Sequence, residues 1–309
     1  MITSFFKKST ILNNGLIVVL LFLFFFLYQT SSLVVPSEAN TTLRYSVLIL
    51  LLLASFFIAS FSVKKNGLTK DSAFVVLFLL IFLLLFPSAF NNLNLVSANF
   101  FVLLALRRLI SLQTLKTPKQ KIFDASVWIF VASLFHFWCI LFIILVYVSI
   151  IFHVSRDFRN WLIPFVAFFI TIVVFILVSF AFDETWIDYL FNQSRINFKI
   201  DYFKNEYQSI AFILYMVFSV YFLFAMIFSL AHKPLILQAS FKKMLFGFVI
   251  GIVIFFLSPD KYNSTLIFTF MPLSVLCTNN VEYAKSKRYQ DIVVLILMAS
   301  AFFTFFSQL

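Results

Sequence analysis

Carboxylate and cationic side chains that could carry out chemistry lie between the long apolar runs of this chain, and one imidazole lies within such a run. Glu38, His136 and Asp183 are the candidate catalytic residues, because carboxylates and imidazoles transfer protons. The residues that could hold a phosphate or another polar ligand are Arg44, Asp260 and Lys261. If the segments that carry these groups converge on one face, they predict a site for a phosphorylated or polar ligand. Each charge taken singly is also typical of a solvated loop.

The sequence patterns of metal and phosphate-loop sites are not found. The three histidines are too widely spaced for a pattern such as HExxH, and the four glycines form no Gly-rich phosphate loop. Cys139 and Cys277 fall inside apolar runs, far from any second ligand, so we predict neither a disulfide nor a metal site. His136 also lies within an apolar run, where it either faces a polar cavity or bonds a free backbone carbonyl at a helix turn.

The composition predicts an all-α membrane protein with a single transmembrane domain over residues 1–309. Hydrophobic residues make up 63% of the chain and charged residues 11%, and several apolar runs are too long to belong to a soluble globule. The net charge of +11 could suggest a nucleic-acid partner, but the basic residues lie in short loops between apolar runs, as membrane topology requires. We therefore expect contacts with membrane lipids and none with nucleic acid.

The apolar run from residue 122 to 152 determines the topology. It is long for one span and short for two, since about 20 residues cross the hydrocarbon core of a bilayer. Basic residues flank both of its ends, which places both on the cytoplasmic side. We expect a pair of short helices that turn between Ser133 and Trp138, with His136 near the outer surface.

The apolar runs predict a helical bundle of about eleven membrane segments. They cover residues 15–28, 45–63, 72–86, 100–112, the two short helices within 122–152, 161–182, 210–230, 244–257, 265–278 and 292–306. With this count, 18 of the 23 Lys and Arg residues lie on the cytoplasmic side. If residues 122–152 crossed the membrane once, every later loop would change sides, and the excess of Lys and Arg in those loops would lie outside. The charge pattern places the N-terminus inside and the C-terminus outside. The bias toward Phe, Ile, Asn and Lys hints at a bacterial source, in which case we expect the inner membrane, with a cytoplasmic N-terminus and a periplasmic C-terminus.

Two features could bind another inner-membrane or periplasmic protein. Residues 183–208 form the longest polar segment and are partly amphipathic, with aromatic candidates for the interface in Trp186, Tyr189 and Phe191. Gly247 and Gly251 form a GxxxG pattern, which lets another helix approach closely. The alternatives are an interfacial loop for the first feature and packing within the chain for the second.

Four segments of the chain are similar to those of a known family, namely MITSFFKKSTILN, LLALRRLISLQ, KIFDASVWIFVASLFHFWCILF and RNWLIPFVAFF. In them the chain resembles a multi-pass inner-membrane protein family of Bacteroidota that carries no known activity. The order of parts more distantly resembles the GT-C superfamily of membrane glycosyltransferases, which use polyprenyl-phosphate sugars. There, a basic loop precedes a pair of short helices, and a late outer loop leads into a span of the kind seen in YNSTLIFTFMPLSVL.

The GT-C resemblance implies a catalytic carboxylate in the first outer loop, which falls by position on Glu38 in VVPSEAN. It also implies a polyprenyl-phosphate lipid as the substrate carrier. Two hypotheses follow: a GT-C-like protein that acts on or binds such a lipid at the outer leaflet, and a non-catalytic membrane subunit that binds a partner protein. A transporter is the third, and it is disfavoured because we place no acidic or basic residue in the middle of a span apart from His136, so ion coupling lacks a carrier.

Overall fold

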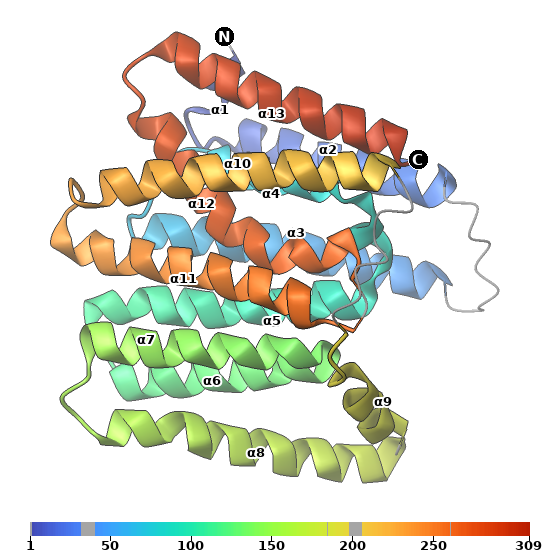
Figure 1. The fold of residues 1–309 in the computed structure, drawn as a ribbon, viewed down its shortest axis with the longest axis vertical. Helices are drawn as coiled ribbons and strands as arrows, with labels where there is room; N and C mark the ends of the chain where they lie inside the picture. Colours follow the sequence, from blue (N-terminus) through green and yellow to red (C-terminus); the bar gives the residue numbers. More distant parts are fainter. Residues whose placement is uncertain (1, 32–40, 184, 198–205, 260) are drawn as a thin grey trace.

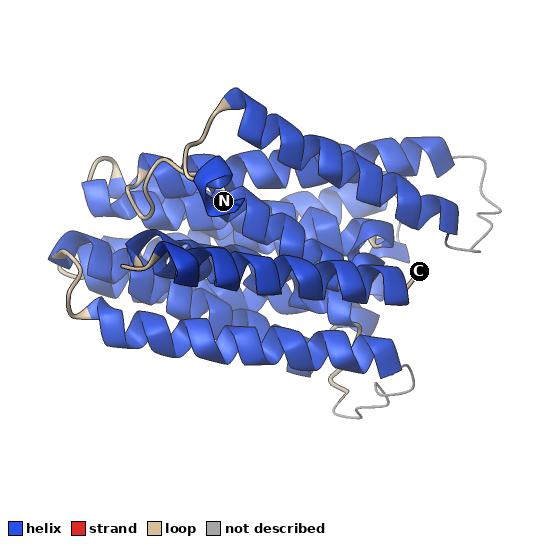
Figure 2. Cartoon of the chain, turned by 90° about the horizontal axis from the view of Figure 1, so that it is seen from above, coloured by secondary structure: helices blue, strands red, loops and turns tan. Residues whose placement is uncertain are grey.

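The computed structural model describes residues 2–31, 41–183, 185–197, 206–259 and 261–309. Within these ranges the regular elements are helices packed side by side in a single bundle, and no strand is present (Figures 1 and 2). The α-helices are α1 (Ile2–Phe6), α2 (Ile11–Ser31), α3 (Thr41–Lys65), α4 (Phe74–Leu85), α5 (Leu93–Ile110), α6 (Pro118–Phe135), α7 (Ile143–His153), α8 (Arg159–Phe182), α9 (Thr185–Gln193), α10 (Glu206–Leu230), α11 (Leu235–Leu257), α12 (Ile267–Tyr283) and α13 (Lys287–Ser307). The short 3-10 helices are η1 (Pro87–Asn91), η2 (Ser111–Thr114), η3 (Phe137–Phe142) and η5 (Asn263–Leu266).

Eight of the described helices are long and apolar enough to cross a membrane, namely α2, α3, α5, α8, α10, α11, α12 and α13. The prediction of a multi-pass helical protein is therefore confirmed. Each of the other predicted segments is also helical, but α4 has only 12 residues, and the helix formed by η3 and α7 is short too. Helix α6 carries three charged residues near its start. Length and composition thus support eight spans, fewer than the eleven predicted.

The bundle is organised around two buried helices, α4 and α12. Every residue of α4 is buried, and its sequence FVVLFLLIFLLL has no polar face, as expected of a helix surrounded by protein on all sides. In the segment Asn263–Tyr283, which contains α12 and packs against α4, 94% of the residues in its most apolar 18-residue stretch are buried. In α8 the corresponding share is 17%, and this helix lies at the edge of the bundle with many apolar side chains exposed, as suits a lipid-facing helix (Figure 1).

The predicted pair of short helices is confirmed. Helix α6 ends at Phe135, His136 adopts an extended backbone conformation, and the chain returns through η3 and α7. The His136 amide closes α6 by donating to the Ala132 carbonyl, and the His136 carbonyl accepts from the Cys139 amide. The turn therefore lies at His136, within the expected range.

The two ends of the bundle differ sharply in charge. At one end, ion pairs join Arg108 to Asp124 and Lys119 to Asp157. Eighteen Lys and Arg residues lie at or near this end, which we call the basic end. The described cations of the opposite end are Arg44, Arg195 and Lys261. The N-terminal helix α1 lies at the basic end, and the C-terminus lies at the opposite end (Figure 1).

Two helices begin well before their predicted starts. Helix α5 begins at Leu93, seven residues before the expected start, because the Asn92 side chain caps it by accepting from the Leu95 amide at 3.0 Å. Helix α11 begins at Leu235 after Pro234, so most of the predicted loop before residue 244 is helical. As a result, Lys243 lies inside a span and is fully buried, which contradicts the expectation that no acidic or basic residue apart from His136 lies in the middle of a span.

The GxxxG residues pack within the chain. Gly247 lies close to Leu145 and Pro272, and Gly251 lies against Thr269 in α12. A Cβ atom at Gly251 would come within 2.5 Å of the Thr269 Cγ2, so this glycine permits the close approach of α11 and α12. Both glycines are buried, so they are helix-packing positions and not a surface for another protein.

Candidate functional site

A polar groove opens at the end of the bundle opposite the basic end. It consists of two adjoining cavities of about 630 and 140 Å³ that share Asn92, Asn94, Tyr262 and Ser264. The other residues of the larger cavity are Tyr28, Arg44, Ser88, Asn91 and Leu93, and those of the smaller are Leu95, Phe135, His136, Tyr189, Gln193, Pro259 and Thr265. The lining is thus rich in amides and hydroxyls, which donate hydrogen bonds to polar headgroups.

Two short 3-10 helices place the polar residues at this groove. Pro87 stops α4 and starts η1, which turns the chain so that the asparagines of the NNLN sequence precede and begin α5. Helix η5 leads into α12 from the other side and presents Ser264. The side-chain amide Nδ2 of Asn263 donates to the Gln208 carbonyl at 3.0 Å, which ties η5 to the start of α10.

Arg44 is the cation of the groove. It lies near the start of α3, and its Nη2 donates to the Asn91 carbonyl at 2.6 Å. A guanidinium has five N–H donors, so this contact leaves donors for an anionic group in the cavity. Arg44 lines the larger cavity, and its phosphate-binding role stays a prediction.

His136 lies at the floor of the smaller cavity. Its Nε2 is 3.0 Å from the Ser258 Oγ, and its ring lies 5.4 Å from that of Phe268 between centroids. Burial lowers the pKa of His136 to about 4, because the charged imidazolium would lose its hydration. The side chain is therefore a neutral hydrogen-bonding group at pH 7 and not a phosphate-binding cation.

Of the three predicted carboxylates, Asp183 is described by the structure, and it does not line the groove. Asp183 is fully exposed, and its side chain accepts from the Thr185 amide at 3.0 Å, so it caps α9. The hydrogen bonds from Thr185 lower the pKa of Asp183. Glu38 and Asp260 fall outside the described residues, and Lys261 does not line the groove. Of the predicted site residues that are described, the structure brings Arg44, His136 and Tyr189 to the groove.

Tyr189 lines the groove, although it is 37% exposed. Its hydroxyl accepts from the Asn94 side-chain amide at 3.0 Å and lies 3.4 Å from the Phe135 carbonyl, which ties α9 to the turn at His136. The other two aromatics of the predicted interface are exposed, Trp186 by 42% and Phe191 by 70%. Residues 184 and 198–205 of the predicted segment fall outside the described residues.

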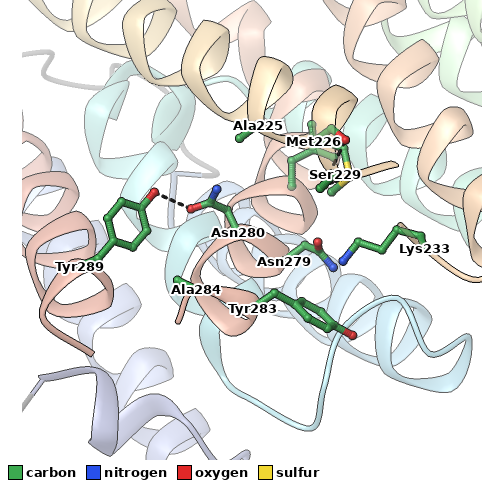
Figure 3. Close-up of a pocket in the computed structure, with 10 residues that line it drawn as sticks. Ala225, Met226, Ser229, Lys233, Asn279, Asn280, Tyr283, Ala284 and Tyr289 are labelled. Carbon is green, nitrogen blue, oxygen red and sulfur yellow. Dashed lines mark hydrogen bonds between the residues drawn. The ribbon is translucent and has the colours of Figure 1, made fainter. Parts of the chain in front are cut away.

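A second cavity, which the sequence analysis did not predict, lies at the basic end (Figure 3). It has a volume of about 270 Å³, and we call it the basic pocket. Its polar lining residues are Ser229, Lys233, Asn279, Asn280, Tyr283 and Tyr289. In the sequence, the adjacent Asn279 and Asn280 near the end of α12 could have indicated this pocket. Amides near the end of an apolar run need hydrogen-bond partners when they are buried.

The sequence matches one protein family over residues 1–309, and that family is described as Family of unknown function (DUF6427). The chain belongs to this family. Neither the comparison with curated proteins nor the comparison with solved structures gave a match. The site of this DUF6427 protein is therefore argued from its own geometry. In the described part of the chain, no three His, Cys, Asp or Glu side chains gather as a metal site would require.

Proposed function

We propose that the protein binds a phosphate-bearing membrane lipid, of the polyprenyl-phosphate kind, in the polar groove. The observation that carries this proposal is the position of Arg44, whose guanidinium lines a cavity of about 630 Å³ among amide and hydroxyl groups. Arginine binds phosphate in a fork geometry with two parallel hydrogen bonds. Apolar helices surround the groove, so a lipid chain can lie against the bundle while its headgroup enters.

The proposed orientation places the groove at the outer leaflet of the bacterial inner membrane. The positive-inside rule assigns the basic end to the cytoplasm, because most of the Lys and Arg residues lie at or near that end. In this orientation α4, α6 and the η3–α7 helix cross the membrane together with the eight long helices. The N-terminus is then cytoplasmic, and the C-terminus is periplasmic.

Binding is better supported than glycosyl transfer. In the GT-C reaction a carboxylate deprotonates the acceptor, yet no Asp or Glu among the described residues lines the groove. Because His136 is neutral and bonded to Ser258, it is poorly placed to replace that carboxylate. Glu38 is the residue that would supply the carboxylate if the protein is an enzyme.

The substitution Arg44→Gln tests the proposed function. We expect the wild-type protein in nanodiscs to retain undecaprenyl phosphate, and Arg44→Gln to weaken this binding by about tenfold or more, because a charge-assisted pair is lost. Native mass spectrometry of the lipid adducts measures the effect. Arg195→Gln is the matched control, since Arg195 is an exposed cation at the same end that does not line the groove. Equal retention by Arg44→Gln and the wild type would contradict the proposal.

A partner-binding role is the second candidate, and α9 favours it. Among its described side chains none is buried, and its exposed aromatics lie at the outer end of the bundle beside the groove. Such a face suits either the lipid headgroup boundary or a periplasmic protein. Cross-linking in membranes tests this role with the double variant Trp186→Ala, Phe191→Ala. If a polypeptide that cross-links to the wild type is lost in this variant while lipid binding is retained, the partner-binding role is supported.

A further inference from the structure

The basic pocket contains a buried amide donor that has no partner. Asn279 lies near the end of α12 and is 3% exposed. Its Nδ2 makes no hydrogen bond to any described residue, although buried polar atoms are paired in the great majority of cases. An unpaired buried donor costs about 1–3 kcal/mol, which a ligand with an oxygen acceptor would recover.

The Lys233 ammonium faces the same space. In Figure 3 the Lys233 side chain extends toward the Asn279 side chain, so that two groups with N–H donors meet across the pocket. Lys233 is held in place by Tyr283, because its Nζ lies 3.7 Å from the centre of that ring. An ammonium and an amide donor that point toward one another favour an anion that accepts hydrogen bonds from both.

The remaining polar groups line the pocket without neutralising this charge. The Tyr289 hydroxyl donates to the Asn280 Oδ1 at 2.8 Å and also bonds the Tyr221 hydroxyl. The Glu282 carboxylate does not line the pocket: it accepts from the Lys70 amide at 2.8 Å and from the Ser72 hydroxyl at 2.5 Å, and its charge attracts Lys233 from outside the lining. Lys233 is therefore the one charged side chain among the lining residues.

We propose that the basic pocket binds a phosphate group, which is held between the Lys233 ammonium and the Asn279 amide. The cavity of about 270 Å³ is roughly nine times the volume of a water molecule, enough for a phosphate with a small substituent. Both the headgroup of an anionic lipid in the cytoplasmic leaflet and a soluble phosphate monoester offer this chemistry. The site is separate from the polar groove, which lies at the other end of the bundle.

The experiment uses the full chain in two arms that separate these sources. In the first arm, protein in phosphatidylcholine nanodiscs is titrated with inorganic phosphate and with glycerol 3-phosphate by calorimetry. In the second, native mass spectrometry measures the retention of phosphatidylglycerol that is added to the same nanodiscs. Both arms compare the wild type with Lys233→Gln, Asn279→Asp and the control Lys285→Gln, which removes an exposed cation near the pocket. Circular dichroism verifies that each variant is folded.

We expect binding in at least one arm, with a loss of about tenfold or more in Lys233→Gln and Asn279→Asp and no loss in Lys285→Gln. The variant Lys233→Arg keeps the cation and should retain part of the affinity. Binding in the first arm identifies a soluble phosphate, and binding in the second arm alone identifies a lipid headgroup. Absence of binding in both arms, or an equal loss in Lys285→Gln, would overturn the proposal, because the second result indicates general attraction to the basic end.

Discussion

The substitution Gly251→Ala is expected to lower the free energy of unfolding by about 1–3 kcal/mol, the usual cost of overpacking a well-packed core. The added Cβ would lie 2.5 Å from the Thr269 Cγ2 and 3.3 Å from the Phe268 carbonyl carbon. Thr269 cannot rotate away freely, because its hydroxyl bonds the Tyr215 hydroxyl and the Leu266 carbonyl, each at 2.5 Å. Unfolding monitored by circular dichroism in detergent measures the loss.

Two further variants show whether the close approach of α11 and α12 causes this loss. Thr269→Ser removes the clashing methyl and keeps the hydroxyl, so adding it to Gly251→Ala should restore part of the stability. Gly15→Ala is the control, since a Cβ there meets no atom within 4 Å, and it should leave stability unchanged or raise it by about 0.5–1 kcal/mol. A Gly251→Ala protein as stable as the wild type would show that α11 and α12 lie farther apart than described.

The substitution Lys243→Met is expected to raise the free energy of unfolding, by up to about 4 kcal/mol. Lys243 is fully buried in α11, and its Nζ donates to the Leu109 carbonyl at 2.6 Å. No described carboxylate forms an ion pair with it, so its desolvation is poorly compensated. Methionine has a similar length and no charge, and unfolding by denaturant compares the two proteins.

Lys242→Met is the matched control for that substitution. Lys242 is the exposed neighbour of Lys243 on the same helix, so its replacement should change stability by less than about 0.5 kcal/mol. If Lys243→Met is strongly destabilised while Lys242→Met is not, the contact with the Leu109 carbonyl holds α5 and α11 together, and the desolvation argument is wrong.

The sequence predicts the helices better than it predicts their ends. Apolar runs located the segments, and basic flanks located the turn at His136, because charge and hydropathy act locally along the chain. The start of α11 was missed because Lys242 and Lys243 resembled a loop sequence. Helix packing instead buries Lys243, and that outcome depends on the Leu109 carbonyl of a helix far away in the sequence.

The candidate site was predicted only in part, for a similar reason. The charges of Arg44 and His136 stood out against apolar surroundings, and both line the groove. The asparagines of NNLN were overlooked, because an uncharged amide gives no signal of function until η1 and η5 bring it beside Arg44. The basic pocket was overlooked too, since Lys233 and Asn279 lie 46 positions apart in the sequence and on different elements.

One labelling experiment tests both the orientation of the bundle and the accessibility of the polar groove. Single cysteines replace Asn94 in the groove and Lys285 at the basic end, in a protein whose buried Cys139 and Cys277 are changed to alanine. In spheroplasts of a bacterial host, a membrane-impermeant maleimide should label Asn94→Cys, and undecaprenyl phosphate added beforehand should reduce that labelling. Lys285→Cys should react only after the membrane is permeabilised. Labelling of Lys285→Cys in intact spheroplasts, with Asn94→Cys protected, would contradict the proposed orientation and place the groove at the cytoplasmic leaflet.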